Sequence, residues 1–191
     1  TSGTIEVDGK KVSITSSQQA IELGLAYVPE DRQLHGLIPA MHITSNISLP
    51  RLHHYARMGW LQKKPERTSS YDAACQMEVR AGHIWQLARE LSGGNQQKVV
   101  LAKWLSTKPR ILILDEPTRG IDVGTKAAVH ALMSKLASEG MAILMISSEL
   151  PEILGMSDRV IVMREGLVTG SFSRAEATQE KIISAATQDV P

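Results

Sequence analysis

The chain has 191 residues, of which 42% are hydrophobic and 21% are charged, and its 21 Lys and Arg nearly balance its 20 Asp and Glu. This composition predicts about one globular domain with a sizeable core. It gives no reason to expect a nucleic-acid partner, which would usually require a basic excess. No apolar run approaches the roughly twenty residues of a membrane span. The single cysteine, Cys75, excludes an internal disulfide and is typical of a reducing compartment.

The N-terminal quarter reads as a hairpin, a short helix and a strand. Residues 5–14 alternate apolar and polar side chains around Asp8-Gly9, a pair that favours a tight hairpin turn. Ser16 or Ser17 is a suitable N-cap for a short helix. Residues 25–28 are apolar and stand before a proline, so we expect a buried strand there.

A block of about residues 45–90 differs from its surroundings and predicts a helical subdomain. Its amphipathic pattern is weak, and Lys63-Lys64-Pro65 reads as a helix breaker. Basic side chains gather in it, which we interpret as a solvated helical face, with a binding patch as the alternative. These side chains are Arg51, Arg57, Lys63, Lys64 and Arg67.

The most informative segment is Leu-Ser-Gly-Gly-Asn-Gln-Gln-Lys at residues 91–98. Ser92 is a natural N-cap, and the apolar residues after it recur at helical spacing. Gly93 and Gly94 let the backbone approach a bulky ligand closely, while a helix N-terminus offers unpaired N–H groups and the positive end of a dipole. We therefore expect an anion-binding start of a helix.

Two carboxylates follow the next apolar run. Residues 111–114 predict a buried strand that ends in Asp115 and Glu116. The carboxyl ends of parallel strands are where α/β sheets place their ligands. Asp115 is a candidate partner of Mg²⁺, directly or through water, and Glu116 is a candidate to polarise an attacking water. The alternative is an acidic turn that merely leads into Pro117.

The remaining third predicts a second strand, a hairpin and a final helix. The apolar runs 111–114 and 142–146 enclose a helix of about residues 125–139, which makes a βαβ unit with both sheet faces covered. Residues 160–170 predict a closing hairpin. Thr178 is placed to cap a last helix from about residue 179.

In this order and at this distance, segments 91–98 and 111–117 resemble the signature and Walker B motifs of an ATP-binding cassette. More narrowly, the chain resembles the C-terminal cassette of the two-cassette ATPases of bacterial simple-sugar importers of the ribose, galactose, xylose and autoinducer type. The runs that carry the resemblance are Tyr27–Arg32, Leu91–Lys98, Asp115–Gly124 and Ile146–Glu149.

The resemblance implies an α/β fold of the P-loop type. We expect one partial nucleotide-binding domain over residues 1–191, with a mostly parallel sheet, helices on both faces and an N-terminal antiparallel hairpin. The helical subdomain would lead to the signature, and residues 91–191 would hold the signature helix, Walker B, the closing strands and the C-terminal helix.

Three departures from the family pattern bear on activity. No segment matches a P-loop, which in the family precedes the position of Thr1, so we expect truncation before that residue. Cassettes generally carry a glutamine where Glu30 stands and a histidine where Ser148 stands. A carboxylate facing phosphate is unfavourable unless a metal intervenes, so the chain's own site is expected to be a weak catalyst. The alternative is that both replacements are functional synonyms.

The resemblance also implies roles for individual residues, with ATP and Mg²⁺ as cofactors. Glu116 would be catalytic and Asp115 would serve the metal. Asp122 would lie at the seam between two cassettes. The nucleotide would be contacted, in part from the partner cassette, by Ser92, Gly93, Gly94, Asn95, Glu30 and Ser148.

The implied function is an energy-coupling ATP hydrolase that drives carbohydrate import, with the isolated chain inactive. Its partners would be a second cassette, in the same polypeptide or a dimer mate, the membrane-spanning permease subunits and, indirectly, a periplasmic sugar-binding protein. The location would be the cytoplasmic face of the bacterial inner membrane. Two alternatives stay open: a degenerate cassette half that binds without hydrolysing, and a cassette ATPase acting on DNA or ribosomes. Nothing in the sequence selects the sugar.

Overall fold

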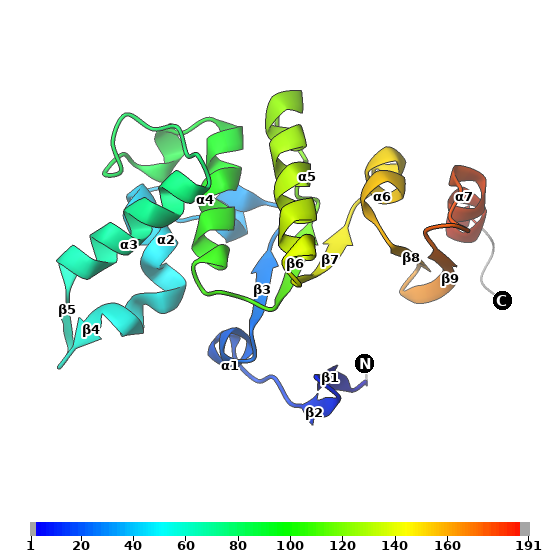
Figure 1. The fold of residues 1–191 in the computed structure, drawn as a ribbon, viewed down its shortest axis with the longest axis horizontal. Coiled ribbons are helices and arrows are strands. Elements are labelled where there is room, and N and C mark those ends of the chain that lie inside the picture. The colour runs from blue at the N-terminus through cyan, green and yellow to red at the C-terminus, as the bar shows by residue number, and fades with distance from the viewer. Residues whose placement is uncertain (1–2, 188–191) are drawn as a thin grey trace. The chain divides into compact units, whose positions relative to one another are not determined.

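A computed structural model describes residues 3–187, which divide into a first compact unit ending at Leu144 and a second beginning at Met145. The course of the chain through each unit can be followed in Figure 1. Within the described residues, no helix is both long enough and apolar enough to cross a membrane.

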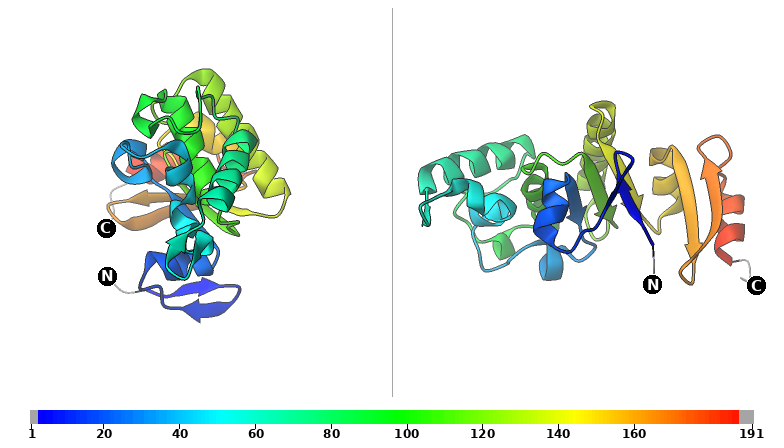
Figure 2. Two further views of the ribbon diagram at one scale, coloured as in Figure 1. Left: turned by 90° about the vertical axis from the view of Figure 1, so that its left-hand side faces the viewer. Right: turned by 90° about the horizontal axis from the view of Figure 1, so that it is seen from below.

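The first unit begins with the expected hairpin. Strands β1 (Ile5–Val7) and β2 (Lys10–Val12) pair antiparallel. Asp8 and Gly9 join them with φ values of 52° and 72°, and this left-handed turn matches the twist of a two-stranded ribbon. The hairpin lies next to helix α1 in both views of Figure 2.

Helix α1 (Ser17–Glu22) begins where the sequence predicts. The Ser16 hydroxyl accepts a hydrogen bond from the Gln19 N–H at 3.2 Å, so it satisfies one of the unpaired donors at the helix start. Gly24 follows with a φ of 80°, a conformation that ends a helix cheaply only at glycine.

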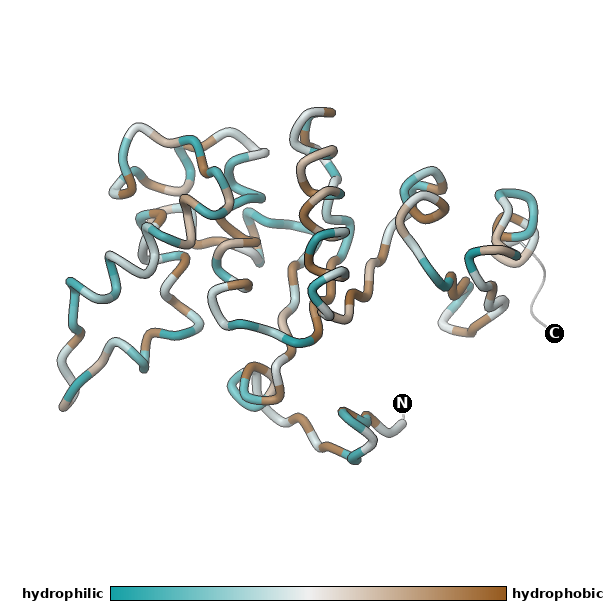
Figure 3. The backbone as a smooth tube through the Cα atoms, viewed as in Figure 1, coloured by the Kyte–Doolittle hydropathy of each residue, from teal (hydrophilic) through white to brown (hydrophobic). Residues whose placement is uncertain are grey.

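The central sheet has the order β3-β6-β7. Strands β3 (Leu25–Val28) and β6 (Ile111–Asp115) are parallel, with Val28 opposite Leu114. The buried core of the unit includes Leu112, which is fully buried on β6, and residues of helix α4 (Gly93–Leu105), which packs against β3. Hydrophobic colour runs along β6 in Figure 3. The α/β class is therefore confirmed.

Strand β7 (Ala142–Ile146) is the least buried strand of this sheet. Its side chains alternate between half-buried and exposed, and Leu144 is 53% exposed. The helix between β6 and β7 is α5 (Val123–Ser138), which buries only Val129 and Met133. Because so little of α5 is buried, alternate side chains of β7 remain exposed to solvent.

The block at 45–90 is less helical than predicted. Helix α2 (Ile43–Ser48) leads into a 3₁₀ segment, η2 (Leu49–Tyr55), and then into a small hairpin of β4 (Ala56–Arg57) and β5 (Trp60–Leu61). Met58 and Gly59 make its turn with φ values of 52° and 82°. Two-residue strands are too short to produce an alternating pattern, so this hairpin could not be predicted from local spacing.

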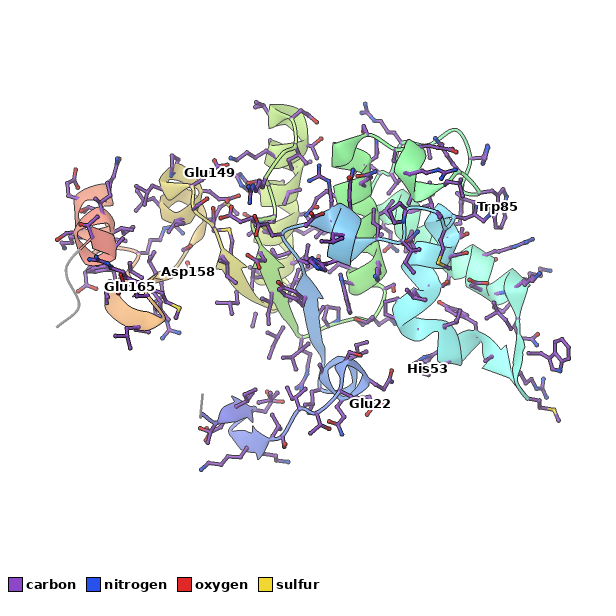
Figure 4. The ribbon with its side chains drawn as sticks, turned by 180° about the vertical axis from the view of Figure 1, so that it is seen from behind. Glu22, His53, Trp85, Glu149, Asp158 and Glu165 are labelled. Atoms are coloured by element: carbon purple, nitrogen blue, oxygen red, sulfur yellow. The ribbon has the colours of Figure 1, made fainter. Side chains whose placement is uncertain are left out.

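Lys63–Pro65 begins a helix rather than breaking one. Helix α3 (Lys63–Gln76) holds Pro65 in its first turn, where the missing N–H has no intrahelical partner to lose. Trp85, labelled in Figure 4, lies in the loop after α3, and the Arg67 guanidinium carbon stands 4.2 Å from its ring centroid. A 3₁₀ turn, η3 (Ala88–Glu90), ends the block.

The second unit contains helix α6 (Leu150–Met156), the antiparallel pair β8 (Arg159–Arg164) and β9 (Leu167–Ser173), and helix α7 (Gln179–Thr187). The Thr178 hydroxyl accepts from the Lys181 N–H at 3.3 Å, so the predicted cap is confirmed. Its core consists of Val160, Val162, Ile182 and Ala185.

The fully buried Leu112 predicts a large effect of truncation. Leu112→Ala removes buried methyl groups and leaves a cavity, so we expect the free energy of unfolding to fall by about 2–5 kcal/mol. Urea denaturation measures the change. Leu34→Ala is the matched control, since that side chain is 72% exposed and should matter far less. Equal losses for both variants would contradict the burial of Leu112 in the core.

Candidate functional site

The start of α4 is organised around Ser92 and Asn95. The Ser92 hydroxyl oxygen accepts from the Asn95 backbone N–H at 3.4 Å and from the Asn95 side-chain amide at 3.0 Å. The Asn95 amide oxygen in turn accepts from the Arg80 N–H at 2.7 Å. In the part of the chain that the structure describes, the Ser92 hydroxyl only accepts, so its own hydrogen is left to donate to a ligand.

The second glycine of the signature segment packs against the start of α5. A Cβ atom at Gly94 would lie 2.6 Å from the Thr125 hydroxyl and 3.3 Å from a carboxylate oxygen of Asp122. Only glycine therefore fits there without displacing its neighbours. The signature segment and the loop that carries Asp122, far apart in the sequence, are in direct contact.

Asp122 is the N-cap of α5. Its carboxylate accepts from the Thr125 N–H at 2.9 Å and from the Thr125 hydroxyl at 2.7 Å. These hydrogen bonds favour the ionised form and hold the pKa of Asp122 below its ordinary value. A stable negative charge therefore stands beside the glycine pair.

Asp115 lies at the carboxyl end of β6 and has a partner that the sequence did not indicate. The Tyr27 hydroxyl donates to one Asp115 carboxylate oxygen at 2.9 Å. This hydrogen bond, then burial, then the negative charge raise the pKa of Tyr27. The parallel register sets Tyr27 opposite Ile113, and side chains two residues apart on a strand share a face, so Tyr27 and Asp115 meet.

Glu116 directly follows Asp115 with a φ of 46°, which is uncommon for a residue other than glycine. Its carbonyl oxygen accepts from the Arg119 N–H at 3.1 Å, and Pro117 and Thr118 between them are buried. This turn holds the backbone in a conformation of elevated energy. Strain of this kind gathers at functional sites, because the surrounding structure must enforce it.

Glu30 pairs with an arginine. Its carboxylate forms an ion pair with the Arg119 guanidinium in the loop after β6. Both side chains are well exposed, so solvent screening keeps the pair weak. The pair nevertheless changes the chemistry at position 30, because the carboxylate is presented to a cation rather than standing alone beside phosphate.

The predicted site residues thus form two groups in the first unit, and one further residue lies in the second. Ser92, Gly93, Gly94 and Asn95 lie together at the start of α4, and Asp122 is in contact with them through Gly94. Asp115 and Glu116 are consecutive at the end of β6, and Glu30 joins the loop after them. Ser148 is exposed between β7 and α6.

The residues present are compatible with Mg²⁺ without forming a cage for it. Among residues 3–187 no group of three or more His, Cys, Asp or Glu side chains could hold a metal ion. Magnesium is usually held by one or two carboxylates, waters and substrate phosphates. Asp115 uses one carboxylate oxygen for Tyr27 and keeps the other for such a role.

The capping carboxylate predicts a pH dependence of stability. The folded pKa of Asp122 lies below the ordinary value of about 3.9. The stabilisation is therefore complete above that pH and is lost as the pH falls through the folded pKa, where the native carboxylate protonates. Asp122→Asn keeps a capping side chain without the charge, so its urea midpoint should fall less steeply below pH ~5. Parallel curves for the two proteins would refute the assignment.

Comparison with known proteins gives the family. The family model described as "ABC transporter" matches residues 1–119. The ribose import ATP-binding protein RbsA 1 of Agrobacterium fabrum is 54% identical over 97% of this chain, which covers 36% of that protein. A putative ribose/galactose/methyl galactoside import ATP-binding protein of Pseudomonas syringae pv. tomato is also 54% identical, with 97% of this chain and 35% of that protein covered. The chain thus spans about a third of the length of these curated relatives.

Solved structures agree on the fold. The dimeric, post-hydrolysis ATP-binding cassette MJ0796, bound to ADP and Pi, has a TM-score of 0.75 and 22% identity, with 91% of this chain and 74% of that chain covered. The ADP conformation of the cassette MJ1267 has a TM-score of 0.71 and 20% identity, with 96% and 72% covered. The family model and the curated relatives together establish that this chain belongs to the ABC transporter family.

Proposed function

We propose that the chain is part of the ATP-hydrolysing, energy-coupling subunit of a bacterial carbohydrate importer. The relatives at 54% identity are named as ribose or galactose import ATP-binding proteins, which supports a sugar as the cargo. The observation that carries the proposal is the contact between the signature segment and the loop after β6, through Gly94 and the Asp122 cap. It joins a helix start suited to phosphate to a strand end that carries two carboxylates.

In this proposal the strand-end carboxylates serve hydrolysis. Asp115 would hold Mg²⁺ with the oxygen that Tyr27 leaves available. The metal, when bound, neutralises charge on phosphate oxygens. Glu116 would accept a proton from, or orient, the water that attacks the terminal phosphate of ATP. The left-handed backbone at Glu116 supports this role, because it sets the side chain's direction at a cost in conformational energy.

The signature segment would serve a nucleotide held mainly by a second cassette. The free hydrogen of the Ser92 hydroxyl and the N–H groups at the start of α4 are suited to a terminal phosphate. Gly93, Gly94 and Asn95 complete this helix start, and Asp122 would lie at the seam. The MJ0796 cassette is dimeric and bound to ADP and Pi, which supports a paired arrangement here.

The helical block would face the membrane-spanning permease subunits, and through them a periplasmic sugar-binding protein. The β4–β5 hairpin supports an external partner, since Met58 is 93% exposed and Trp60 is 77% exposed at its tip. Large apolar side chains at such exposure are typical of interaction surfaces when they gather. This arrangement corresponds to the cytoplasmic face of the bacterial inner membrane.

A second candidate function is a cassette half that lends its signature while another site performs the chemistry. The Glu30–Arg119 ion pair favours it, because a carboxylate engaged with an arginine is not the amide that cassettes generally place there. Ser148 in place of the usual histidine points the same way.

Replacing the candidate base separates these two functions. Glu116→Gln in the full-length, reconstituted transporter should lower stimulated ATP turnover by about 10²–10⁴-fold, because the amide cannot accept the water's proton. ATP binding, measured in parallel, should persist. Glu22→Gln on α1 is the matched control and should leave turnover unchanged. Unchanged turnover in Glu116→Gln would instead identify a passive cassette half.

A bulky residue at the helix start tests the signature. Ser92→Phe should abolish transport and stimulated hydrolysis. Because Ser92 is exposed but caps α4, the thermal midpoint should fall only by the few degrees that loss of one N-cap causes, about 2–4 °C per kcal/mol. Ser138→Phe, at the exposed end of α5, controls for the added ring. Normal stimulated hydrolysis in the Ser92 variant would contradict the role assigned to the signature segment.

A further inference from the structure

We infer that Arg32 is a positioning residue that fixes the start of the signature helix against the loop after β6. The inference rests on the proposed function and assigns to Arg32 a role that it performs through neighbouring residues. One guanidinium nitrogen, Nη1, donates to the Arg119 carbonyl at 3.0 Å, and Nη2 donates to the Gly120 carbonyl at 3.2 Å. The planar fork of arginine can span two consecutive carbonyls, which the single ammonium of lysine cannot reproduce.

The same guanidinium group packs against the first glycine of the signature segment. A Cβ atom at Gly93 would lie 2.7 Å from Nη2 of Arg32, 3.5 Å from its Cζ and 3.5 Å from the Gly120 carbonyl oxygen. Gly120 is also near, since a Cβ atom there would lie 3.8 Å from Nη2. The guanidinium group is thus enclosed between two glycines from segments 27 positions apart in the sequence.

The backbone that carries Arg32 is a single π-helical turn, η1 (Arg32–Gly36). The Asp31 carboxylate caps it and accepts from the N–H groups of Gln33 and Leu34, both at 2.9 Å. These bonds hold the pKa of Asp31 below its ordinary value. The Leu37 N–H donates to the Arg32 carbonyl at 2.8 Å and closes the wide turn. π-Helical turns are rare in proteins, and those that occur are often found at functional sites.

This turn is itself fastened to α4. The Gln33 side chain donates to the Gln96 side-chain oxygen at 3.2 Å. At the other end of the turn, the Lys103 ammonium donates to the Gly36 carbonyl at 3.0 Å. Lys103 is buried, and burial lowers its pKa. Because both ends of the turn bond to α4, the Arg32 side chain has a fixed base from which to reach the loop after β6.

The loop after β3 and the loop after β6 are therefore connected by two interactions. Glu30 pairs with the Arg119 side chain, and Arg32 binds the backbone of Arg119 and Gly120. We call residues 30–32 together with 119–120 the loop interlock. Gly93 packs against Arg32 of this interlock. A displacement of either loop therefore also moves the start of α4, which would meet the terminal phosphate.

The arrangement is not optimised for stability. The Nε of Arg32 is buried and has no hydrogen-bond partner in the described structure. A buried donor without a partner is destabilising. Removal of the guanidinium group should therefore affect turnover much more than the unfolding midpoint, which separates positioning from general structural support.

The test is a double-mutant cycle on stimulated ATP turnover in the full-length, reconstituted transporter, with Gly93→Ala, Arg32→Ala and the pair. Gly93→Ala should lower turnover at least tenfold in the wild-type background, because the new methyl group meets the guanidinium group. In the Arg32→Ala background the same change should cost less than threefold. Arg32→Ala alone should lower kcat at least fivefold with the KM for ATP within twofold, and Arg32→Lys should fail to restore it. Additive losses, within twofold, would overturn the inference.

Arg110→Ala is the matched control. Arg110 also donates to a backbone carbonyl, that of Leu23 at 3.2 Å, and pairs with Asp8, but at the opposite end of the strands. The turnover of Arg110→Ala should stay within twofold of the wild type. A loss equal to that of Arg32→Ala would overturn the inference. If Arg32→Ala does not assemble, the cycle is run with Arg32→Lys. A wild-type transporter without ATP turnover refutes the proposed function, whereas an active wild type with an additive cycle refutes only the role of Arg32.

Discussion

The parallel pairing of β3 with β6 is the constraint on which the site depends. With Val28 opposite Leu114, both strands end at the same edge of the sheet, and each continues into a loop that carries charged side chains. Tyr27 meets Asp115, Glu30 meets Arg119, and Arg32 reaches the next two carbonyls. A register slip by one residue would reverse the face of every side chain on β3 and break the first of these contacts. Apolar burial of Val28, Leu112 and Leu114 holds the register, so core packing and site geometry have one cause.

Local signals were sufficient to predict many of the elements. Asp8-Gly9 defines its hairpin because both residues tolerate positive φ, and Ser16 and Thr178 cap helices with bonds that span only three residues. The strand-end position of Asp115 follows from one apolar run. Each of these features is decided by side chains close together in the sequence, so composition and spacing contain the necessary information.

Contacts between distant segments could not be read in this way. The partners of Tyr27 and Arg32 lie 87 or 88 positions away, and nothing in either local pattern indicates which backbone or carboxylate they will reach. The need for glycine at position 93 was likewise predicted only in part. The sequence suggests a close ligand, and the structure shows in addition a neighbouring guanidinium group. The error at Lys63–Pro65 has another origin, because proline is unfavourable inside a helix but acceptable in its first turn.

The left-handed backbone at Glu116 has a consequence for engineering. Glycine, and to a lesser degree asparagine, adopts that conformation at little conformational cost, and both lack a carboxylate. Selection for thermal stability alone would therefore favour the replacements at this position that remove the candidate base. The position is one at which stability and activity oppose each other, and a thermostabilised version of the chain should be designed with Glu116 held constant.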